Sequence, residues 1–298
     1  MEYLIGTDIG ATNTRIAVVN PAGEIITIQR LPSQMALGQP FFQKVGQVVA
    51  SLAKAYGAVT VGVASAGQID RETGSYLPGL YPTAPWVGIP LKKIMATTTG
   101  LPTFVDNDCK ISAYAELKIG QGQGIKDFIS LTLGTGLGGG IISNGQLIHG
   151  IHGVAGHVGH LSLDHHGPQC ACGNRGCLEL YVSGTAIAKQ GSLVFQKELS
   201  SPEVFQRAAN GDKLALQILQ DAGYALGRGL GAMANLLNPQ LFILGGGILE
   251  WYPLLEPSVQ ASFQASAMNG LKDTPIVRSQ LGGEGGVIGA ALYAWDQL

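Results

Sequence analysis

A group of three cysteines and one histidine near the middle of the chain has the residue types of a metal site. Cys170, Cys172 and Cys177 fall within eight residues, and His160 precedes the first of them by ten residues. Three thiolates and an imidazole are the ligand set of a closed, tetrahedral structural zinc site. Buried free thiols or a disulfide are the alternatives, but the crowding of the cysteines and the lack of an export signal argue against a disulfide. We therefore expect these four residues to bind one structural Zn²⁺ ion.

Two short turns have the glycines and hydroxyl groups that could bind phosphate. Asp8, Gly10 and Thr12 lie between two predicted strands, where N–H groups and hydroxyls could face a phosphate and the carboxylate a Mg²⁺ ion. Taken alone, this segment also fits an ordinary hairpin. A second turn, Gly134-Thr135-Gly136, follows another predicted strand, and two such turns facing each other would hold a polyphosphate.

Two further segments allow both a structural and a functional interpretation. Asn107 and Asp108 follow a predicted strand and open a helix, so either could be a routine N-cap worth about 1 kcal/mol. Asp108 could instead serve as a general base. Gly245, Gly246 and Gly247 follow a buried strand, where they would let a flat base approach the backbone or simply form a tight turn.

Three common motifs are excluded. Gly134-x-Gly136-x-x-Gly139 fits the dinucleotide fingerprint, but a strand follows it where that fingerprint needs a helix. The chain has no Gly-x4-Gly-Lys-Ser/Thr sequence, which excludes the P-loop ATPases. The segment from Gly62 to Gly67 has one residue too many for the Gly-x-Ser-x-Gly turn of serine hydrolases.

Hydrophobic periodicity and turn residues predict the helices and strands that must position these residues. They form two rounds of β-β-β-α-β-α, and periodicity alone supports an α/β protein, with two domains expected. The predicted strands are 3–7, 14–19, 24–30, 60–64, 103–105, 128–133, 139–143, 146–148, 241–244 and 275–278. The predicted helices are 40–56, 91–99, 111–119, 201–210, 213–237 and 289–295.

Composition narrows the class of protein and its partners. Charged residues make up 13% of the 298 residues, and 44 residues are glycine, which suits a compact α/β protein with many tight turns. The net charge of −2 offers no basic field, so we expect no nucleic-acid partner. The first ten residues lack the features of a signal peptide, and no apolar run is long enough to span a membrane. With reduced cysteines, this predicts a cytoplasmic protein without membrane association.

Taken together, these segments resemble the signature of the ROK family of sugar kinases and repressors. The run Gly156 to Glu179 follows the pattern GxxGHxxxD…CxCGxxGCxE. Asp8-Ile-Gly-Ala-Thr, Asn107-Asp108, the glycine run from Gly134 and Gly245-Gly-Gly stand in the family's order and spacing. The resemblance covers nearly the whole chain and implies the two-domain, duplicated actin-like ATPase (ribonuclease H-like) fold with a central cleft.

The resemblance also implies a role for each candidate residue. It makes the protein an ATP- and Mg²⁺-dependent kinase for the 6-hydroxyl of a hexose or N-acetylhexosamine, with Asp108 as the general base. The implied sugar ligands are Asn107, His157, His160 and Glu179, and the implied nucleotide and Mg²⁺ ligands are Asp8, Gly10, Thr12, Gly134, Thr135, Gly136, Gly245, Gly246 and Gly247. His149, His152, His165 and His166 are interpreted as surface or turn residues.

The chain departs from the family pattern at two positions that are expected to contact the sugar. His157 stands where most members have Glu, and the Asn usually found near Pro82-Thr83 is absent. Imidazole suits an N-acetyl group better than carboxylate does, and the run from Ala155 to His160 resembles N-acetylmannosamine kinases. We therefore expect N-acetylmannosamine as the substrate, with a glucokinase as the alternative. A sugar-responsive regulator or a non-catalytic sugar-binding protein is the more distant alternative.

The expected domains are residues 1–120, with helix 286–298 packing back on them, and residues 121–285, with a zinc-binding insert at 157–179. Members of the family are commonly dimers or tetramers, so the resemblance also implies a homodimer or homotetramer.

Overall fold

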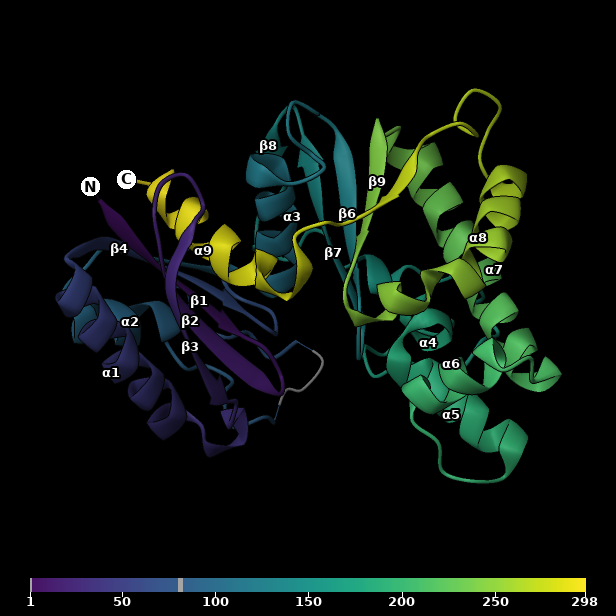
Figure 1. Cartoon of the computed structure of the whole chain (residues 1–298), viewed down its shortest axis with the longest axis horizontal. Helices are drawn as coiled ribbons and strands as arrows, with labels where there is room; N and C mark the ends of the chain where they lie inside the picture. Colours follow the sequence, from purple (N-terminus) through teal and green to yellow (C-terminus); the bar gives the residue numbers. More distant parts are fainter. Residues whose placement is uncertain (1, 80–82) are drawn as a thin grey trace. The chain divides into compact units, whose positions relative to one another are not determined.

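The computed structural model describes residues 2–79 and 83–298, which form two five-stranded sheets and the helices that flank them (Figure 1). The strands are β1 (Tyr3–Ile9), β2 (Asn13–Val19), β3 (Ile25–Pro32), β4 (Ala58–Ser65), β5 (Thr103–Asn107), β6 (Phe128–Leu133), β7 (Leu137–Ser143), β8 (Gln146–Leu147), β9 (Leu241–Gly245) and β10 (Ile276–Arg278). The α-helices are α1 (Gln39–Tyr56), α2 (Leu91–Thr99), α3 (Asp108–Ile119), α4 (Glu179–Val182), α5 (Gly184–Phe195), α6 (Ser201–Ala209), α7 (Lys213–Leu237), α8 (Tyr252–Ser266) and α9 (Gly285–Trp295).

The two sheets have the same strand order. The first runs β3-β2-β1-β4-β5, and the second, read in the matching direction, runs β8-β7-β6-β9-β10. In the first sheet β1, β2 and β3 are antiparallel neighbours, whereas β4 and β5 continue parallel to β1. In the second sheet β7 and β8 are antiparallel, whereas β6, β9 and β10 are parallel. The predicted duplicated α/β architecture of the actin-like ATPase type is confirmed.

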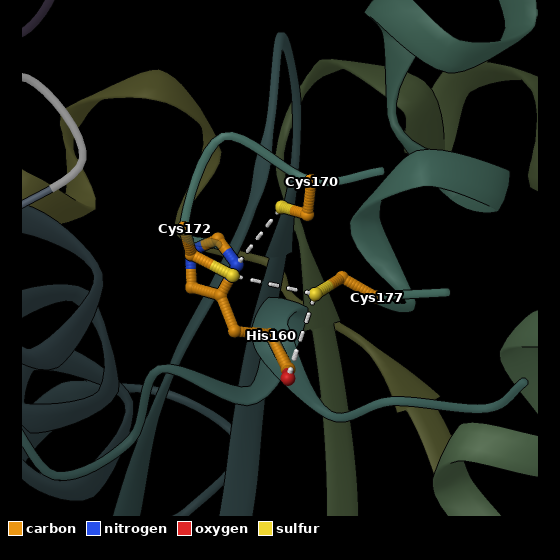
Figure 2. A group of neighbouring side chains, drawn as sticks. All are labelled: His160, Cys170, Cys172 and Cys177. Atoms are coloured by element: carbon orange, nitrogen blue, oxygen red, sulfur yellow. Dashed lines mark hydrogen bonds between the residues drawn. The ribbon is translucent and has the colours of Figure 1, made fainter. Parts of the chain in front are cut away.

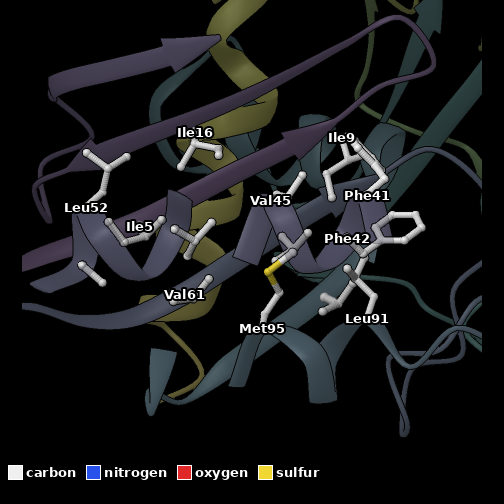
Figure 3. Close-up of a cluster of buried hydrophobic side chains, with 14 of the residues drawn as sticks. Ile5, Ile9, Ile16, Phe41, Phe42, Val45, Leu52, Val61, Leu91 and Met95 are labelled. Atoms are coloured by element: carbon white, nitrogen blue, oxygen red, sulfur yellow. The ribbon is translucent and has the colours of Figure 1, made fainter. Parts of the chain in front are cut away.

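Helices cover both faces of the first sheet. Alternate residues of β1 and β4 point to opposite faces, as the pleat of a strand requires. Ile5, Ile9 and Val61 pack against α1 and α2, where Phe42 and Met95 complete one buried cluster (Figure 3). On the other face α9 packs against β1, β4 and α3. The result is a three-layer arrangement in which both sheet faces are dry.

Two glycines allow α9 to approach that second face closely. A Cβ atom at Gly6 would collide with the carbonyl oxygen of Val287, and one at Gly62 with the carbonyl oxygen of Ala290. The helix backbone therefore lies directly on the strands, at positions where any side chain would force it away. This explains part of the high glycine content of the sequence.

In the second half of the chain, α7 and α8 pack against each other along their lengths. The ring of Phe263 in α8 meets that of Phe242 in β9 edge-on, with centroids 6.0 Å apart, which joins this helix pair to the sheet. Two glycines of α7, Gly223 and Gly227, would clash with the α8 backbone if they carried a side chain. Among the described helices, none combines the length and the apolarity that crossing a lipid bilayer requires.

By their internal contacts, the residues form two compact units. Unit 1 contains residues 1–126, 140–156 and 280–298, and unit 2 contains residues 127–139 and 157–279. The domain boundaries expected from the sequence stay a prediction. The C-terminal helix α9 belongs to unit 1, where it contacts β1, β4 and α3.

Three helices, α4, α5 and α8, have no counterpart among the elements predicted from the sequence. Helix α8 contains Pro257 and has a second proline in its first turn, and proline is a helix breaker in most positions. Helix α5 begins with Gly184 and contains Gly191, which packs tightly against Val204 of α6. In both helices tertiary packing outweighs unfavourable local propensity.

Candidate functional site

The candidate residues of unit 1 gather at one edge of the first sheet. Strands β1, β4 and β5 are parallel, and their register aligns Asp8 with Ala64 and Ser65 with Asn107. The carboxyl ends of the three strands therefore carry Asp8 and Asn107 on neighbouring strands, and Asp108 follows directly as the first residue of α3. The topology thus brings together these candidates from distant parts of the sequence.

Asn107 and Asp108 are held by a local network of hydrogen bonds. The Asn107 side chain caps α3 by accepting from the N–H groups of Cys109 and Lys110, and it donates to Gly67 O and to Asp108 Oδ1. Asp108 Oδ1 also accepts from the Cys109 N–H, at 2.9 Å. Both of these bonds end on Oδ1, so neither engages Oδ2, the oxygen that a general base would use. The cap and the general-base interpretations of this pair are therefore compatible.

Two carboxyl groups of like charge lie within electrostatic reach of each other here. Burial, followed by the charge of Asp108, raises the pKa of Asp8 to about 6, although Arg15 forms an ion pair with Asp8 at 3.2 Å. Burial likewise raises the pKa of Asp108. A cation would relieve this repulsion, and carboxylate oxygen is the ligand that Mg²⁺ prefers. Asp8 therefore fits the expected magnesium ligand.

The first glycine turn connects β1 to β2. The Gly10 N–H donates to Asn13 O at 3.1 Å, and the Ser33 N–H donates to Thr12 O at 2.9 Å, so backbone bonds fix the turn from both sides. The side chain of Thr12 remains exposed beyond it. Its hydroxyl can therefore reach a ligand without breaking the turn.

In unit 2 the other two glycine segments lie next to each other. Strands β6 and β9 are parallel neighbours, so Gly134 and Gly245 leave the same edge of the second sheet. Gly246 has a φ of 95°, and a Cβ atom there would collide with Leu133 O, so only glycine fits this position. The exposed backbone of Gly246 and Gly247 remains accessible to a flat ligand.

The turn from Gly134 to Gly136 is fixed by the start of helix α5. Gly134 O accepts from the Gly184 N–H at 2.8 Å, and Thr135 O accepts from the Thr185 hydroxyl at 2.8 Å. Within the turn, the Gly134 N–H donates to Gly136 O at 3.0 Å. The carbonyl groups of the first two residues are thus engaged by the helix.

Glu179, an expected sugar ligand, lies against the same turn. Its Oε2 accepts from the Leu137 N–H at 2.8 Å, and a side chain at Gly136 would run into this carboxylate. One carboxylate oxygen therefore holds the glycine turn, which leaves the other oxygen for a ligand. The sequence did not predict that Glu179, an expected sugar ligand, contacts the turn that is expected to bind phosphate.

The predicted metal ligands converge in unit 2 (Figure 2). His160 Nδ1 lies 3.7 Å from Cys170 Sγ, Cys172 Sγ lies 3.6 Å from Cys177 Sγ, and the four ligand atoms all lie within 4.8 Å of one another. With Zn–S bonds of about 2.3 Å, the corners of a tetrahedral zinc site are about 3.7 Å apart. The spacing of these four side chains therefore fits a zinc ion.

The acid–base properties of the cluster agree with a metal site. Burial and the neighbouring sulfur atoms raise the pKa of Cys177 to about 12, so this thiol would stay protonated at neutral pH without a cation. A divalent metal favours the thiolate form, so Cys177 could bind it at neutral pH despite the raised pKa. His157, the remaining expected sugar ligand, lies beside the cluster, with its ring centroid 6.3 Å from that of His160.

Some residues have environments that sequence reasoning missed. The expectation that His149 is a surface or turn residue is wrong: it is buried, and its Nδ1 lies 2.8 Å from Asp106 Oδ2. His152, His165 and His166 are exposed, as expected. Arg15 was also not identified from the sequence as a partner of Asp8. A single arginine within an apolar predicted strand could have indicated it.

Comparison with known proteins identifies relatives along the whole chain. The profile of the ROK family matches residues 4–297. A glucokinase of Halalkalibacterium halodurans is 32% identical over 320 residues, covering 99% of this chain and 96% of the glucokinase. An N-acetylmannosamine kinase of Escherichia coli O157:H7 is 32% identical over 295 residues, covering 97% of each chain.

A solved structure has a similar fold over the same length. The ROK family glucokinase from Streptomyces griseus, in complex with glucose and AMPPNP, is 30% identical with a TM-score of 0.84. The match covers 99% of each chain. The pair Asn107-Asp108, the glycine turns and the cysteine cluster thus occur in a chain whose fold is similar throughout to that of this kinase.

Proposed function

Because this chain belongs to the ROK family, we propose that it is a kinase that transfers the γ-phosphoryl group of ATP to the 6-hydroxyl of a hexose or an N-acetylhexosamine. The observation that carries the proposal is the geometry of Asp108 at the start of α3. Its Oδ1 accepts from Asn107 and from a backbone N–H, and neither bond engages Oδ2, the oxygen proposed to accept the proton. Burial raises the pKa of this carboxyl group, which makes it a stronger base once ionised.

In this proposal Asp108 Oδ2 takes the proton of the sugar hydroxyl as that oxygen attacks the phosphoryl group. Asn107 fixes the carboxylate; to bind a neighbouring hydroxyl, its amide would exchange the hydrogen bond to Gly67 O or to Asp108 Oδ1 for one to the sugar. A positioned base contributes a factor of about 10²–10⁴ to the rate. Most of the remaining acceleration comes from orientation and from neutralising charge on the phosphates.

The glycine turns and Asp8 supply the nucleotide-binding groups. Thr12 in unit 1, with Thr135 and Gly136 in unit 2, would contribute N–H groups and hydroxyls to the phosphates, whereas the N–H groups of Gly10 and Gly134 bond within their turns and fix their shape. Gly245, Gly246 and Gly247 lie against the adenosine, where the exposed backbone accepts a flat ring. Asp8 would hold Mg²⁺, which would offset the negative charge of the phosphates.

The proposed sugar ligands of unit 2 lie within the cysteine cluster or next to it in the chain. His157, His160 and Glu179 are proposed to bind sugar hydroxyls or the N-acetyl group. His160, Cys170, Cys172 and Cys177 would hold a structural Zn²⁺ ion, which would fix the segment that carries these ligands and take no part in the chemistry.

Two sugars are the candidate acceptors. The relatives named glucokinase and N-acetylmannosamine kinase are equally similar to this chain, at 32% identity. His157 favours N-acetylmannosamine, because a neutral imidazole offers one donor and one acceptor, whereas a carboxylate only accepts from sugar hydroxyls. The missing Asn near Pro82-Thr83 gives no further guidance, since Pro82 lies outside the described residues.

A coupled assay of ADP release tests the proposal directly. The purified protein is incubated with ATP, Mg²⁺ and each of glucose, mannose, fructose, allose, N-acetylglucosamine and N-acetylmannosamine. We expect sugar-dependent ADP release with glucose or N-acetylmannosamine as the best acceptor. Sugar binding without ADP release from any of them would contradict the kinase assignment and favour a sugar-responsive regulator.

His157→Glu separates the two acceptors. If His157 selects N-acetylmannosamine, the substitution lowers the kcat/KM ratio of N-acetylmannosamine over glucose, by an amount on the order of tenfold for one polar contact. The measurement is the pair of kcat/KM values for wild type and variant. A wild type that prefers glucose, with a ratio that the substitution leaves unchanged, contradicts this role of His157 and leaves the kinase assignment intact.

A further inference from the structure

Lys110 is a fully buried cation directly beside the candidate base. Its side chain is 1% exposed, and it lies two residues after Asp108 in the first turn of α3. A buried ammonium group is costly unless it is paired and hydrogen-bonded, so its partners show what holds it there. Lys110 Nζ forms an ion pair with Asp106 Oδ1 and donates a hydrogen bond to Gly153 O at 2.5 Å.

Asp106 is the centre of this network. Its side chain is 2% exposed; Oδ1 accepts from the Asn107 N–H at 2.7 Å, and Oδ2 faces His149 Nδ1 at 2.8 Å. Although burial alone would raise the pKa of Asp106, His149 and Lys110 lower it, so the carboxylate is ionised at neutral pH. One buried carboxylate thus connects the end of β5, the start of α3 and the segment that contains His149 and Gly153.

That segment leads directly to a second candidate ligand. Residues 149–156 form the last part of unit 1 before the chain enters unit 2 at His157. Gly153 lies tightly against the turn at Ile69, where a side chain would clash, and the Ala155 N–H donates to His149 O at 3.0 Å. The segment is therefore fixed within unit 1 at Gly153 and at His149, the two residues that the network holds.

We propose that Lys110 is a positioning residue for phosphoryl transfer, because its ammonium group holds both the backbone that aims Asp108 and the segment that leads to His157. The inference rests on the proposed function, but the network itself involves neither nucleotide nor zinc. The carboxylate of Asp106 fixes the Asn107 N–H, and Asn107 in turn holds Asp108 Oδ1. Loss of the ammonium group loosens the base and the segment together.

Lys110→Met tests this role, and Lys118→Met is the matched control. Lys118 lies in the last turn of the same helix, at the opposite end from Asp108, in a partly exposed ion pair with Asp296. We expect Lys110→Met to lower kcat with sugar by about 10–100-fold, the cost of a small misplacement of reacting groups. The KM for the sugar rises and the KM for ATP stays constant, since the glycine turns that bind most of the nucleotide belong to unit 2. Lys118→Met keeps wild-type kinetics.

A double variant separates positioning from stability. Lys110→Met leaves the Asp106 carboxylate buried without its cation, so the variant could fail to fold for that reason alone. Asp106→Asn with Lys110→Met removes both charges, which restores folding, but it still leaves Gly153 O without its donor. We expect the double variant to regain thermal stability and to keep a reduced kcat. Recovery of both would overturn the positioning role and leave a purely structural one.

Amide hydrogen exchange provides a readout that does not depend on turnover. In the double variant, exchange should accelerate at residues 107–109 and at residues 153–156, while residues of α7 in unit 2 remain protected as in wild type. Unchanged exchange in either segment overturns the inference. If the wild type phosphorylates no sugar, the proposed function fails, and the exchange result still decides whether Lys110 couples the two segments.

Discussion

The pair of buried carboxyl groups in unit 1 gives the candidate site a property that depends on pH. Burial first, then the charge of Asp108, raises the pKa of Asp8 to about 6. Between the ordinary carboxyl pKa and this value, the folded state binds more protons than the unfolded state. The free energy of unfolding therefore falls as pH rises through that window. Above the window, the ionised Asp8 carboxylate lowers it by the full amount.

We expect Asp8→Asn to remove this cost in Mg²⁺-free buffer. The gain in unfolding free energy should be on the order of 2 kcal/mol above the window and should shrink as pH falls through it. The measurement is the thermal midpoint of wild type and variant, from one pH unit below the Asp8 pKa to one unit above it.

Asp70→Asn is the control for that series. Hydrogen bonds from Thr73 to the exposed Asp70 carboxylate lower its pKa, so Asp70 is ionised throughout the same range. Its substitution should change the thermal midpoint by the same amount at every pH tested. An Asp8→Asn effect that is equally independent of pH would contradict the assignment of a raised pKa to Asp8.

Asp108→Asn tests the proposed base. Asparagine keeps the size of the side chain and the acceptor for the Cys109 N–H, but it cannot take a proton. We expect turnover with sugar to fall by about 10²–10⁴-fold. Calorimetric titration with an ATP analogue should give an unchanged affinity, and a variant that keeps more than about a tenth of wild-type turnover would argue against the base role.

The positions of the candidate residues at strand ends could be predicted from sequence, but some of their surroundings could not. Asp8, Asn107 and Asp108 stand at strand ends, where short-range patterns suffice to find them. The buried contacts of Lys110 with Gly153 and of His149 with Asp106 join residues about 40 positions apart. Nothing local distinguishes such a lysine or histidine from the surface residues that these types usually are.

At the scale of elements, the segment that contains the cysteines holds several short stretches of backbone together. The Leu178 N–H donates to Leu161 O at 2.8 Å, and Ser162 pairs with Cys177, so the strand-like stretch after His160 runs beside the last cysteine. Helix α4, which begins at Glu179, follows at once. Few apolar side chains stabilise this region, so the metal is expected to supply much of its order.

We expect the purified protein to contain one zinc ion per chain and Cys172→Ser to lose it. Loss of a ligand should release the segment that carries Glu179, so that thermal stability and sugar affinity fall together. Elemental analysis and calorimetry measure both. Cys109→Ser is the control, because Cys109 lies outside the cluster and its substitution should leave the zinc content unchanged; a zinc content that Cys172→Ser leaves at the wild-type level would contradict the assignment.

Most elements could be predicted from periodicity, and each exception has a physical cause. Helices α2 and α7 were expected with the bounds that the structure has, because their apolar residues recur at helical spacing. Helix α3 begins three residues earlier than expected, at Asp108, because the Asn107 side chain caps it. Helix α8 escaped prediction because its prolines contradict its pattern, and only its packing on α7 makes it helical.

At the scale of the whole molecule, unit 1 is completed by the far end of the chain. Helix α9 lies on β1 and β4, strands that precede it by more than 200 residues in the sequence. The glycines of these strands let its backbone carbonyls contact the sheet directly. The stability of unit 1 therefore depends on a fit between backbone and backbone, which cannot adjust as side chains do.

Gly62→Ala tests this fit. The added methyl group would collide with the Ala290 carbonyl, so we expect α9 to shift and unit 1 to lose about 3 kcal/mol, the upper part of the range for overpacking. Gly57→Ala is the control: Gly57 has open space around it and only a left-handed backbone, which costs alanine about 1 kcal/mol. Hydrogen exchange in β1 and β4 reports the loss, and equal effects of the two substitutions would contradict the close-fit interpretation.

The late position of α9 also has a consequence for how the protein is made. As the ribosome extends the chain, β1, β4 and β5 emerge early, but the helix that covers one face of their sheet emerges last. The second segment of unit 2 ends at residue 279, so all of unit 2 is released before that helix. A nascent chain at this stage would carry a finished unit 2 and a unit 1 whose apolar sheet face is still bare. During that interval the growing chain is most exposed to aggregation, and chaperones that bind nascent chains would be needed most.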